Sequence, residues 1–410
     1  MTDCARNISY DNAADNVSTT PMSDMNFGVN GGVFDNSDTP VALLAGGGTA
    51  GHVNPLLATA KQLRQRGWLV HILGTSQGLE SDLVPRAGFE LHTIDKVAMP
   101  RRFTRELITV PMRLFRSVNQ VRELIRRLHV DVVVGFGGYV STPAYVAAHR
   151  EKIPLVIHEQ NARPGLANRL GARWAQHVAL TFSSTDLTAR HGQTSVIGLP
   201  LRDDIEQLAR HRISDSHSTR VRAARFFDLH PQRPILLVTG GSLGAQQLNE
   251  AMVGALKEGI DPSTQIIHLT GKGKDVEVRK AGASMPNYRV FDYLNEMDKA
   301  LACADLVVCR SGAGTVSELC ALAIPAVYVP LPHGNGEQRY NAADVIEAGG
   351  AFLINNDAMD STAVRKRILP LLEEETKLKK MSEAAARCGN IAAAQALADR
   401  VVECKGDRRS

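Results

Sequence analysis

The sequence predicts an α/β protein made of two domains, each with a mostly parallel sheet whose strands alternate with helices. Its 410 residues exceed the size at which a single hydrophobic core usually stops growing. Apolar runs such as Val41–Ala45 and Pro154–His158 are continuous rather than alternating, which is typical of parallel strands covered on both faces. The order strand, glycine-rich turn, helix occurs early in the chain and starts again at Pro234–Thr239, which indicates two βαβ-built halves.

Composition excludes several classes of protein. The chain is 44% hydrophobic and 22% charged, as soluble globular proteins are, and its net charge of +4 is too small to indicate a nucleic-acid partner. The six cysteines form no CxxC pair, which indicates reduced thiols rather than a zinc site. No apolar run reaches the length of a spanning helix and none resembles a signal core, so we expect neither secretion by that route nor insertion into a membrane.

The first part of the chain divides into a tail and a domain. Residues 1–40 are rich in Asn, Asp, Ser, Thr and Gly and are predicted to be disordered. The first domain is predicted at 41–199, and its opening helix is expected to be capped by Asn54, with Pro55 in its first turn. Further strands are expected at Leu69–Gly74, Val130–Val134 and His177–Thr181.

The second domain is predicted at 200–380, after a polar, helical stretch that ends near His230. Residues 380–402 are rich in alanine and are predicted to be helical. Strands of this domain are expected at Pro234–Thr239, Gln265–Thr270, Tyr288–Phe291, Asp305–Cys309 and Ala326–Pro330.

Three glycine turns lie between a predicted strand and a predicted helix, at residues 46–52, 135–139 and 240–245. Such turns bind phosphate, because glycine admits a ligand close to the backbone and the helix start offers free N–H groups. The first turn also matches GxGxxG, but a dinucleotide site needs an acid near the end of the second strand, and none precedes Glu80. A nicotinamide cofactor is therefore disfavoured. The alternative is that the glycines only form tight turns and bind no ligand. The presence of three such turns in two similar halves makes this alternative less attractive.

A fourth segment, Arg310–Glu318, follows a predicted strand and opens a helix. Its glycines suit a ligand-facing turn, and the Glu318 carboxylate suits a vicinal diol such as that of a ribose. The alternative is that Glu318 stabilises the first turn of its own helix.

Six motifs in order resemble the MurG family: GGGTAGH at 46–52, GFGGYVSTP at 135–143, HEQN at 158–161, GGSLGA at 240–245, RSGAGTVSE at 310–318 and GEQRYNA at 336–342. The family comprises the UDP-N-acetylglucosamine (UDP-GlcNAc) transferases that complete the lipid-linked disaccharide-pentapeptide of bacterial peptidoglycan. The resemblance covers about residues 41–402. It implies the GT-B fold, in which two Rossmann-like domains face each other across a cleft, with a final helix at 381–410 that packs back onto the first domain.

The resemblance also implies the site that holds UDP-GlcNAc. Arg202 and Ser242 would contact its phosphates, Leu294 would lie beside the uracil, Glu318 would bind the ribose hydroxyls and Gln338 the sugar. Some relatives carry a Gln pair where this chain has Glu337-Gln338, so the assignment is made to Gln338 alone. The implied donor-binding set is Thr49, Ala50, Gly51, Asn161, Arg202, Ser242, Leu294, Ala313, Gly314, Thr315, Val316, Ser317, Glu318 and Gln338. The acceptor pyrophosphate is assigned to Gly48, Gly137, Gly138 and Tyr139.

The implied reaction is an inverting transfer in one displacement. His52 is the candidate base, because an imidazole with an ordinary pKa near ~6.5 suits that task; the alternative is that His52 only positions the substrate. Glu159 is a second candidate, interpreted as structural. The predicted folded part contains no DxD metal motif, so helix starts, Ser242 and Arg202 are expected to stabilise the leaving UDP, with no metal and no cofactor required.

Residues 96–127 hold nine Lys or Arg and two Glu, interleaved with apolar side chains. The pattern favours binding to anionic lipid headgroups, and the alternative is a solvated helix face beside a core stripe. With an acceptor anchored by its polyprenyl tail, we expect a peripheral protein on the cytoplasmic face of the cell membrane. The residues assigned to membrane contact are Arg101, Arg102, Phe103, Arg105, Leu107 and Ile108.

The leading hypothesis is transfer of GlcNAc to the polyprenyl-pyrophosphate-linked muramyl-pentapeptide. Three alternatives stay open: another GT-B transferase with a lipid acceptor such as diacylglycerol, a UDP-sugar epimerase that releases free sugar, and a nucleotide-binding module without catalysis. Partner proteins of cell-wall synthesis are also left open.

Overall fold

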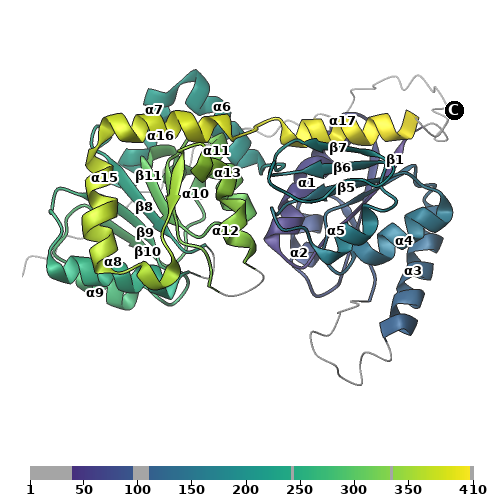
Figure 1. Cartoon of the computed structure of the whole chain (residues 1–410), viewed down its shortest axis with the longest axis horizontal. Coiled ribbons are helices and arrows are strands. Elements are labelled where there is room, and N and C mark those ends of the chain that lie inside the picture. Colours follow the sequence, from purple (N-terminus) through teal and green to yellow (C-terminus); the bar gives the residue numbers. More distant parts are fainter. Residues whose placement is uncertain (1–38, 96–109, 242–243, 333–335, 407–410) are drawn as a thin grey trace, which may run out of the picture. The chain divides into compact units, whose positions relative to one another are not determined.

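The computed structural model describes residues 39–95, 110–241, 244–332 and 336–406 (Figure 1). All but the last two residues of the predicted tail lie outside this part of the chain. So do Ser242 and the six residues assigned to membrane contact, whose predictions stay untested. Within the described part, no helix is long and apolar enough to cross a membrane.

The first sheet has seven parallel strands in the order β3-β2-β1-β4-β5-β6-β7. Its central strand β1 pairs with β2 on one side and with β4 on the other, and Leu43 of β1 lies opposite His71 and Val133. The chain therefore leaves β1 toward one edge of the sheet and later returns to its other side. The bounds are β1 Val41–Ala45, β2 Leu69–Gly74, β3 Glu90–Thr93, β4 Val132–Gly135, β5 Leu155–Glu159, β6 His177–Leu180 and β7 Gln193–Val196.

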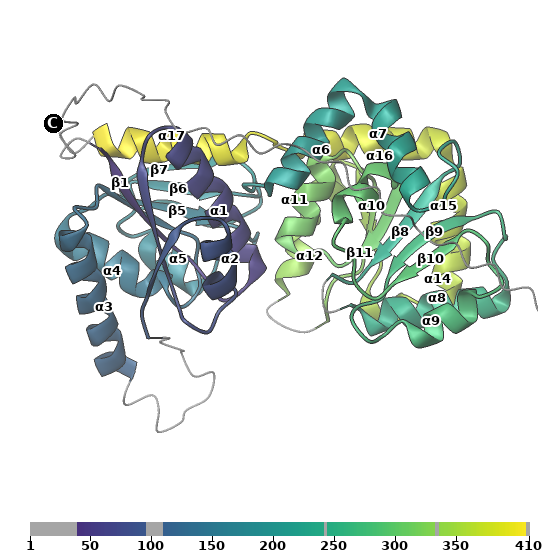
Figure 2. The same ribbon diagram turned by 180° about the vertical axis from the view of Figure 1, so that it is seen from behind.

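Helices cover both faces of the first sheet (Figures 1 and 2). On one face α1 and the last helix, α17, pack together, and Leu56 and Leu63 share a buried cluster with Leu397 and Val401. On the other face α3 and α4 pack side by side over Leu43 and neighbouring strand residues. The bounds are α1 Ala50–Gln65, α2 Glu80–Arg86, α3 Val110–Arg127, α4 Ser141–Glu151, α5 Leu166–Gly171 and α17 Ala393–Gly406.

The second sheet has six parallel strands in the order β10-β9-β8-β11-β12-β13, with β8 in the same position that β1 holds in the first. Its strands are β8 Ile235–Thr239, β9 Gln265–Leu269, β10 Tyr288–Phe291, β11 Leu306–Cys309, β12 Ala326–Tyr328 and β13 Ala351–Leu353. Its helices include α6 Asp203–Ser214, α7 Ser216–Phe226, α8 Gln246–Glu258, α9 Val276–Gly282, α10 Met297–Cys303, α11 Ala313–Ala321, α12 Glu337–Asn341, α13 Ala343–Glu347, α14 Ser361–Ala363, α15 Leu369–Glu373 and α16 Glu375–Arg387.

This strand order decides where ligands bind. In open parallel sheets the binding crevice lies at the carboxyl ends of the strands, where the strand order reverses. The reversal lies between β1 and β4 in the first sheet and between β8 and β11 in the second. The glycine turn of residues 46–48 follows β1, and the segment that opens at Arg310 follows β11. Both therefore lie at their sheet's switch point.

Two local predictions were wrong. The helical segment predicted at residues 380–402 is divided, since α16 ends at Arg387 and α17 begins at Ala393. The helix after β1 begins at Ala50 with Thr49 as its N-cap, so Asn54 does not cap it and Pro55 lies inside it. The Thr49 hydroxyl makes no capping hydrogen bond and lies 2.9 Å from Nδ1 of His52 instead. The earlier start places His52 in the first turn of α1, beside the glycine turn.

Candidate active site

The two glycine turns of the first sheet form one surface. The Ser141 hydroxyl lies 3.0 Å from the carbonyl oxygen of Ala45, at the end of β1, and 2.7 Å from that of Gly137, in the turn after β4. Gly138 has a positive φ of 82°, and a Cβ atom there would lie 2.9 Å from the carbonyl oxygen of Gly47. This close approach requires glycine. The structure thus brings together the residues assigned to the acceptor pyrophosphate, Gly48, Gly137, Gly138 and Tyr139.

Glu80 supports this surface and was given no role by the sequence analysis. Its buried carboxylate accepts hydrogen bonds from the Gly48 N–H at 2.8 Å, the Thr75 N–H at 3.0 Å and the Thr75 hydroxyl at 2.7 Å. Burial raises the pKa of Glu80, but these hydrogen bonds outweigh it and the net pKa is lowered. The carboxylate is therefore ionised at neutral pH. Because the Gly48 N–H is engaged by Glu80, other groups of the turn would have to contact a pyrophosphate.

His52, the candidate base, lies between the two turns. Its Nδ1 faces the Thr49 hydroxyl at 2.9 Å, and its Nε2 lies 3.4 Å from where a Cβ atom of Gly137 would be. Burial lowers the pKa of His52, and the negative charge of Glu80 opposes that shift only in part. The imidazole is thus neutral at neutral pH and has one ring nitrogen directed toward the proposed acceptor surface.

Glu159, the second candidate base, is held as a scaffold. Its two oxygens accept hydrogen bonds from the N–H of Asn161 at 2.9 Å, the N–H of Gly165 at 3.0 Å and the side-chain amide of Asn168 at 2.8 Å. Burial raises its pKa, and these donors oppose the rise. Three donors from residues 161–168 thus engage both oxygens of Glu159, and its structural role stays a prediction.

A cavity of about 440 Å³ lies at the switch point of the second sheet. Its lining combines Thr239 at the end of β8 and Gly241 after it with Gly312 before α11, so the start of that helix is close to the ligand space. Helix starts present N–H groups without an intrahelical partner and carry a positive dipole end. Five residues of the predicted donor set line this cavity, and they come from four segments of the chain: Arg202, Leu294, Thr315 with Glu318, and Gln338.

Arg202 and Glu318 are paired within this cavity. The Arg202 Nε lies 3.3 Å from Oε1 of Glu318, and another nitrogen of the guanidinium lies 3.2 Å from Oδ2 of Asp204. Burial raises the pKa of Glu318, whereas the Arg202 charge lowers it. The Gln338 side-chain oxygen accepts a hydrogen bond from the N–H of Leu331 at 3.0 Å. A cation, an acid and an amide therefore converge on one space of nucleotide size.

The other predicted donor residues within the described part of the chain do not line this cavity. Val316 and Ser317 lie between Thr315 and Glu318 on α11 but line a second cavity of about 450 Å³ that also includes Asn341 and Cys388. Asn161 accepts a hydrogen bond from the Asn341 amide at 3.3 Å. Thr49, Ala50 and Gly51 are exposed at the start of α1, and Ala313 and Gly314 are half-buried at the start of α11. The roles of these residues stay predictions.

Known protein families and relatives that are similar to this chain agree with this geometry. The Glycosyltransferase family 28 N-terminal domain matches residues 42–180, and the Glycosyltransferase family 28 C-terminal domain matches residues 235–401. A relative from Bifidobacterium longum (strain DJO10A) is 45% identical over 387 residues, covering 90% of this chain and 98% of the relative. One from Acidothermus cellulolyticus is 43% identical over 373 residues, with 90% and 98% covered. Both are named UDP-N-acetylglucosamine--N-acetylmuramyl-(pentapeptide) pyrophosphoryl-undecaprenol N-acetylglucosamine transferase. The chain belongs to the MurG family.

Solved structures confirm the predicted fold. The crystal structure of Acinetobacter baumannii MurG is 30% identical and superposes with a TM-score of 0.70, covering 89% of this chain and 99% of that one. A UDP-GlcNAc 2-epimerase from Neisseria meningitidis bound to UDP-GlcNAc is only 12% identical, with a TM-score of 0.65, 89% of this chain covered and 100% of the other. That second likeness is one of fold alone, and the GT-B architecture is common to both.

Proposed function

We propose that this chain transfers GlcNAc from UDP-GlcNAc to the muramyl-pentapeptide carried on polyprenyl pyrophosphate, with inversion at the anomeric carbon. Membership in the family supports the reaction, because the named relatives match over nine-tenths of the chain. The observation that carries the donor assignment is the convergence of Arg202, Glu318 and Gln338 on one cavity at a switch point.

The donor would occupy this cavity with its uracil beside the buried Leu294 and its ribose hydroxyls on the Glu318 carboxylate. Arg202 and the start of α11 supply positive charge for the two phosphates, and Ser242 is assigned to them as well. When UDP-GlcNAc enters, Arg202 would exchange part of its contact with Glu318 for the phosphates. Gln338 would bind the sugar. The donor is a substrate, and we propose that the reaction consumes no cofactor.

The chemistry needs one base. The acceptor hydroxyl oxygen forms a bond to the anomeric carbon, the bond from that carbon to the UDP oxygen breaks, and UDP leaves with the electron pair. His52 would take the hydroxyl proton on Nε2, with Nδ1–H donating to Thr49. The lowered pKa of His52 keeps its imidazole neutral and ready to accept that proton.

The acceptor pyrophosphate would lie on the joined glycine turns, near the starts of α1 and α4, where helix dipoles favour anions. Gly137 and Gly138 allow the backbone to approach it closely. The Glu80 carboxylate holds the backbone of the first turn through the hydrogen bond that it accepts from the Gly48 N–H.

We also propose a peripheral location on the cytoplasmic face of the cell membrane. The first two turns of α3 expose Met112 and Phe115, with 71% and 58% of their surfaces accessible, and Arg113 and Arg116 lie beside them in the sequence. Exposed apolar groups next to cations suit anionic headgroups. This helix directly follows the predicted membrane segment of residues 101–108.

An acceptor-dependence assay tests the proposed reaction. Purified protein is given UDP-GlcNAc with or without a short-chain lipid-linked muramyl-pentapeptide, and released UDP is measured beside sugar products. We expect UDP release only when the acceptor is present. Release of a free sugar without acceptor would indicate an epimerase, and transfer to diacylglycerol alone would indicate another lipid-directed transferase; either would overturn the proposal.

A further inference from the structure

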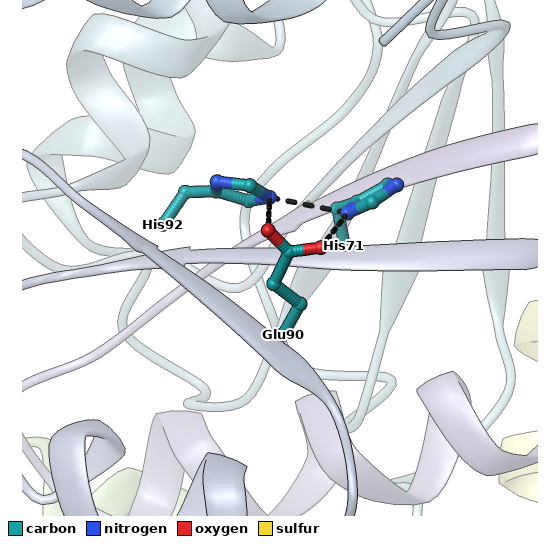
Figure 3. Close-up of side chains that lie close together, drawn as sticks. All are labelled: His71, Glu90 and His92. Atoms are coloured by element: carbon teal, nitrogen blue, oxygen red, sulfur yellow. Dashed lines mark hydrogen bonds and ion pairs between the residues drawn. The ribbon is translucent and has the colours of Figure 1, made fainter.

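Two imidazoles and a carboxylate meet at the edge of the first sheet, away from both proposed substrate sites (Figure 3). His71 lies on β2, and Glu90 and His92 lie on the edge strand β3. His71 is the direct partner of Glu90 in the parallel register, and His92 is two residues further along β3. Because side chains two apart in a strand share a face, the register places all three groups on one face of the sheet.

Their ligand atoms have the spacing of a metal's coordination sphere. The His92 Nε2 is 3.1 Å from the His71 Nδ1, and the Glu90 oxygens are 3.3 Å from the His71 Nδ1 and 3.4 Å from the His92 Nε2. Tetrahedral ligands at zinc-to-nitrogen distances of ~2.0–2.1 Å are about 3.3–3.4 Å apart. The two nitrogens are thus separated by close to one edge of a zinc tetrahedron, and each has its own Glu90 oxygen beside it, Oε2 for His71 and Oε1 for His92, so the carboxylate is within reach of an ion held between the imidazoles.

We propose that His71, Glu90 and His92 bind a divalent transition-metal ion, for which Zn²⁺ is the best match, and that the ion fastens edge strand β3 to β2. Two imidazoles and one carboxylate are a ligand set that Zn²⁺ accepts and that Mg²⁺ does not prefer. The histidine side chains are mostly buried, at 17% and 14% exposure, whereas Glu90 is 63% exposed. Solvent therefore reaches the carboxylate of the cluster, and water from that side would complete the coordination of an ion.

A bound ion would hold edge strand β3 to β2 more firmly than the pairing of the two strands does alone. Strand β3 has only four residues and pairs with β2 on one side, at the edge of the sheet. A metal that joins both strands would stabilise the folded state by an amount that grows with the logarithm of its free concentration relative to its Kd. The proposal is independent of glycosyl transfer, so failure of either one leaves the other standing.

The nearby side chain of Arg127 predicts the direction in which the affinity for a metal ion should change. Arg127, at the end of α3, acts on His92 as a like charge, while Glu90 acts as an opposite charge. A bound cation experiences both fields. Removing the Arg127 charge should therefore strengthen metal binding, and removing the Glu90 charge should weaken it.

The experiment measures Zn²⁺ binding to the full chain, purified without a polyhistidine tag and stripped with a chelator. Calorimetry gives stoichiometry and affinity, and Co²⁺ as a probe gives visible ligand-field absorption. The variants are His71→Gln, His92→Gln, Glu90→Gln and Arg127→Gln. His191→Ala, at an exposed histidine, is the matched control. Circular dichroism establishes that each variant is folded.

We expect one Zn²⁺ per chain, a rise in melting temperature with Zn²⁺ but not with Mg²⁺, and an affinity loss of at least ~100-fold in the histidine variants, because loss of even an outer-shell partner costs about 10–100-fold. His191→Ala should bind as wild type does, and Arg127→Gln should bind more tightly. Binding that is absent from wild type, or unchanged by the three ligand substitutions, would overturn the proposal and leave the two imidazoles as a hydrogen-bonded pair.

Discussion

The carboxylate of Glu80 accepts a hydrogen bond from the backbone N–H of Gly48 at 2.8 Å, across 32 positions of sequence. This contact joins the start of α2 to the turn assigned to the acceptor. Glu80→Gln should leave one of its three donors without an acceptor, which costs about 1–3 kcal/mol of stability for a buried group. We expect a raised KM for the lipid acceptor and an unchanged Kd for UDP, measured by kinetics and calorimetry.

Asp82→Asn is the matched control for Glu80, because Asp82 lies on the same helix but is exposed. It should leave both constants as they are. The pKa of Glu80 is lowered in the fold, so its contribution to stability is complete above its unfolded pKa of ~4.3 and is lost only as pH falls through the lower folded value. A Glu80→Gln enzyme with normal acceptor kinetics would remove Glu80 from the site.

His52→Ala should lower kcat by about 10²–10⁴-fold, the usual contribution of a general base, without weakening UDP binding. Thr49→Val should cause a smaller loss, because it removes only the group that orients the ring. The base works in its neutral form, above its pKa, and burial lowers that pKa. The acid limb of kcat/KM should therefore lie below about pH 6.5. An acid limb above that value, or an active His52→Ala enzyme, would assign the base elsewhere.

Glu159→Gln distinguishes a scaffold from a base. The substitution puts an amide N–H₂ where a carboxylate accepts from Asn161, Gly165 and Asn168, so at least one donor faces another donor. We expect a loss of about 1–3 kcal/mol in unfolding free energy and a residual activity that follows the folded fraction. Denaturant unfolding beside kinetics measures both. A stable but inactive Glu159→Gln protein would indicate a catalytic role.

Glu318→Ala should weaken UDP binding by about 10- to 100-fold, since hydrogen bonds to a charged group contribute about 1.5–3 kcal/mol. The loss should appear in calorimetry with UDP alone. Glu383→Gln, an exposed acid on α16, is the control and should bind UDP as wild type does. If Glu318 serves only its own helix, Glu318→Ala will lower the melting temperature and leave the UDP affinity unchanged.

The exposed start of α3 should contribute to membrane binding. Met112→Ser combined with Phe115→Ser should reduce co-sedimentation with anionic vesicles by at least ~10-fold, because both groups lose apolar contact with lipid. Charge reversal at Arg101, Arg102 and Arg105 should act in the same direction. Leu166→Ser with Ile213→Ser is matched in exposure, at 79% and 76%, and should leave vesicle binding unchanged. Equal losses in both pairs would show a general effect of surface hydrophobicity.

The sequence predicted the buried strands well and missed the polar edges. Strands β1, β2 and β10 have the bounds that the sequence predicted. Strands β3 and β7 were missed because Glu90–Thr93 and Gln193–Val196 lie at the two edges of the sheet and carry polar side chains. The three-residue strand β13 is too short for a periodic signal.

Some residues of the candidate site follow motifs along the chain, whereas others are brought to it only by tertiary packing. Glu318 lies in one of the six motifs and Arg202 lies outside them, yet the resemblance assigned both to the donor and both line one cavity. Glu80 had no pattern of its own, since its role depends on the backbone turn that folds around it. The His71, Glu90 and His92 cluster depends on pairing with a strand that the sequence analysis did not find.

The most direct test of the account follows label from UDP-[¹⁴C]GlcNAc into a short-chain lipid-linked muramyl-pentapeptide, with wild type, His52→Ala and Glu318→Ala side by side. We expect labelled lipid from the wild type, with the sugar in a β-linkage, and strong losses of label transfer in both variants. Label that stays water-soluble, with UDP-sugar or free sugar as the only product, would contradict the proposed transfer.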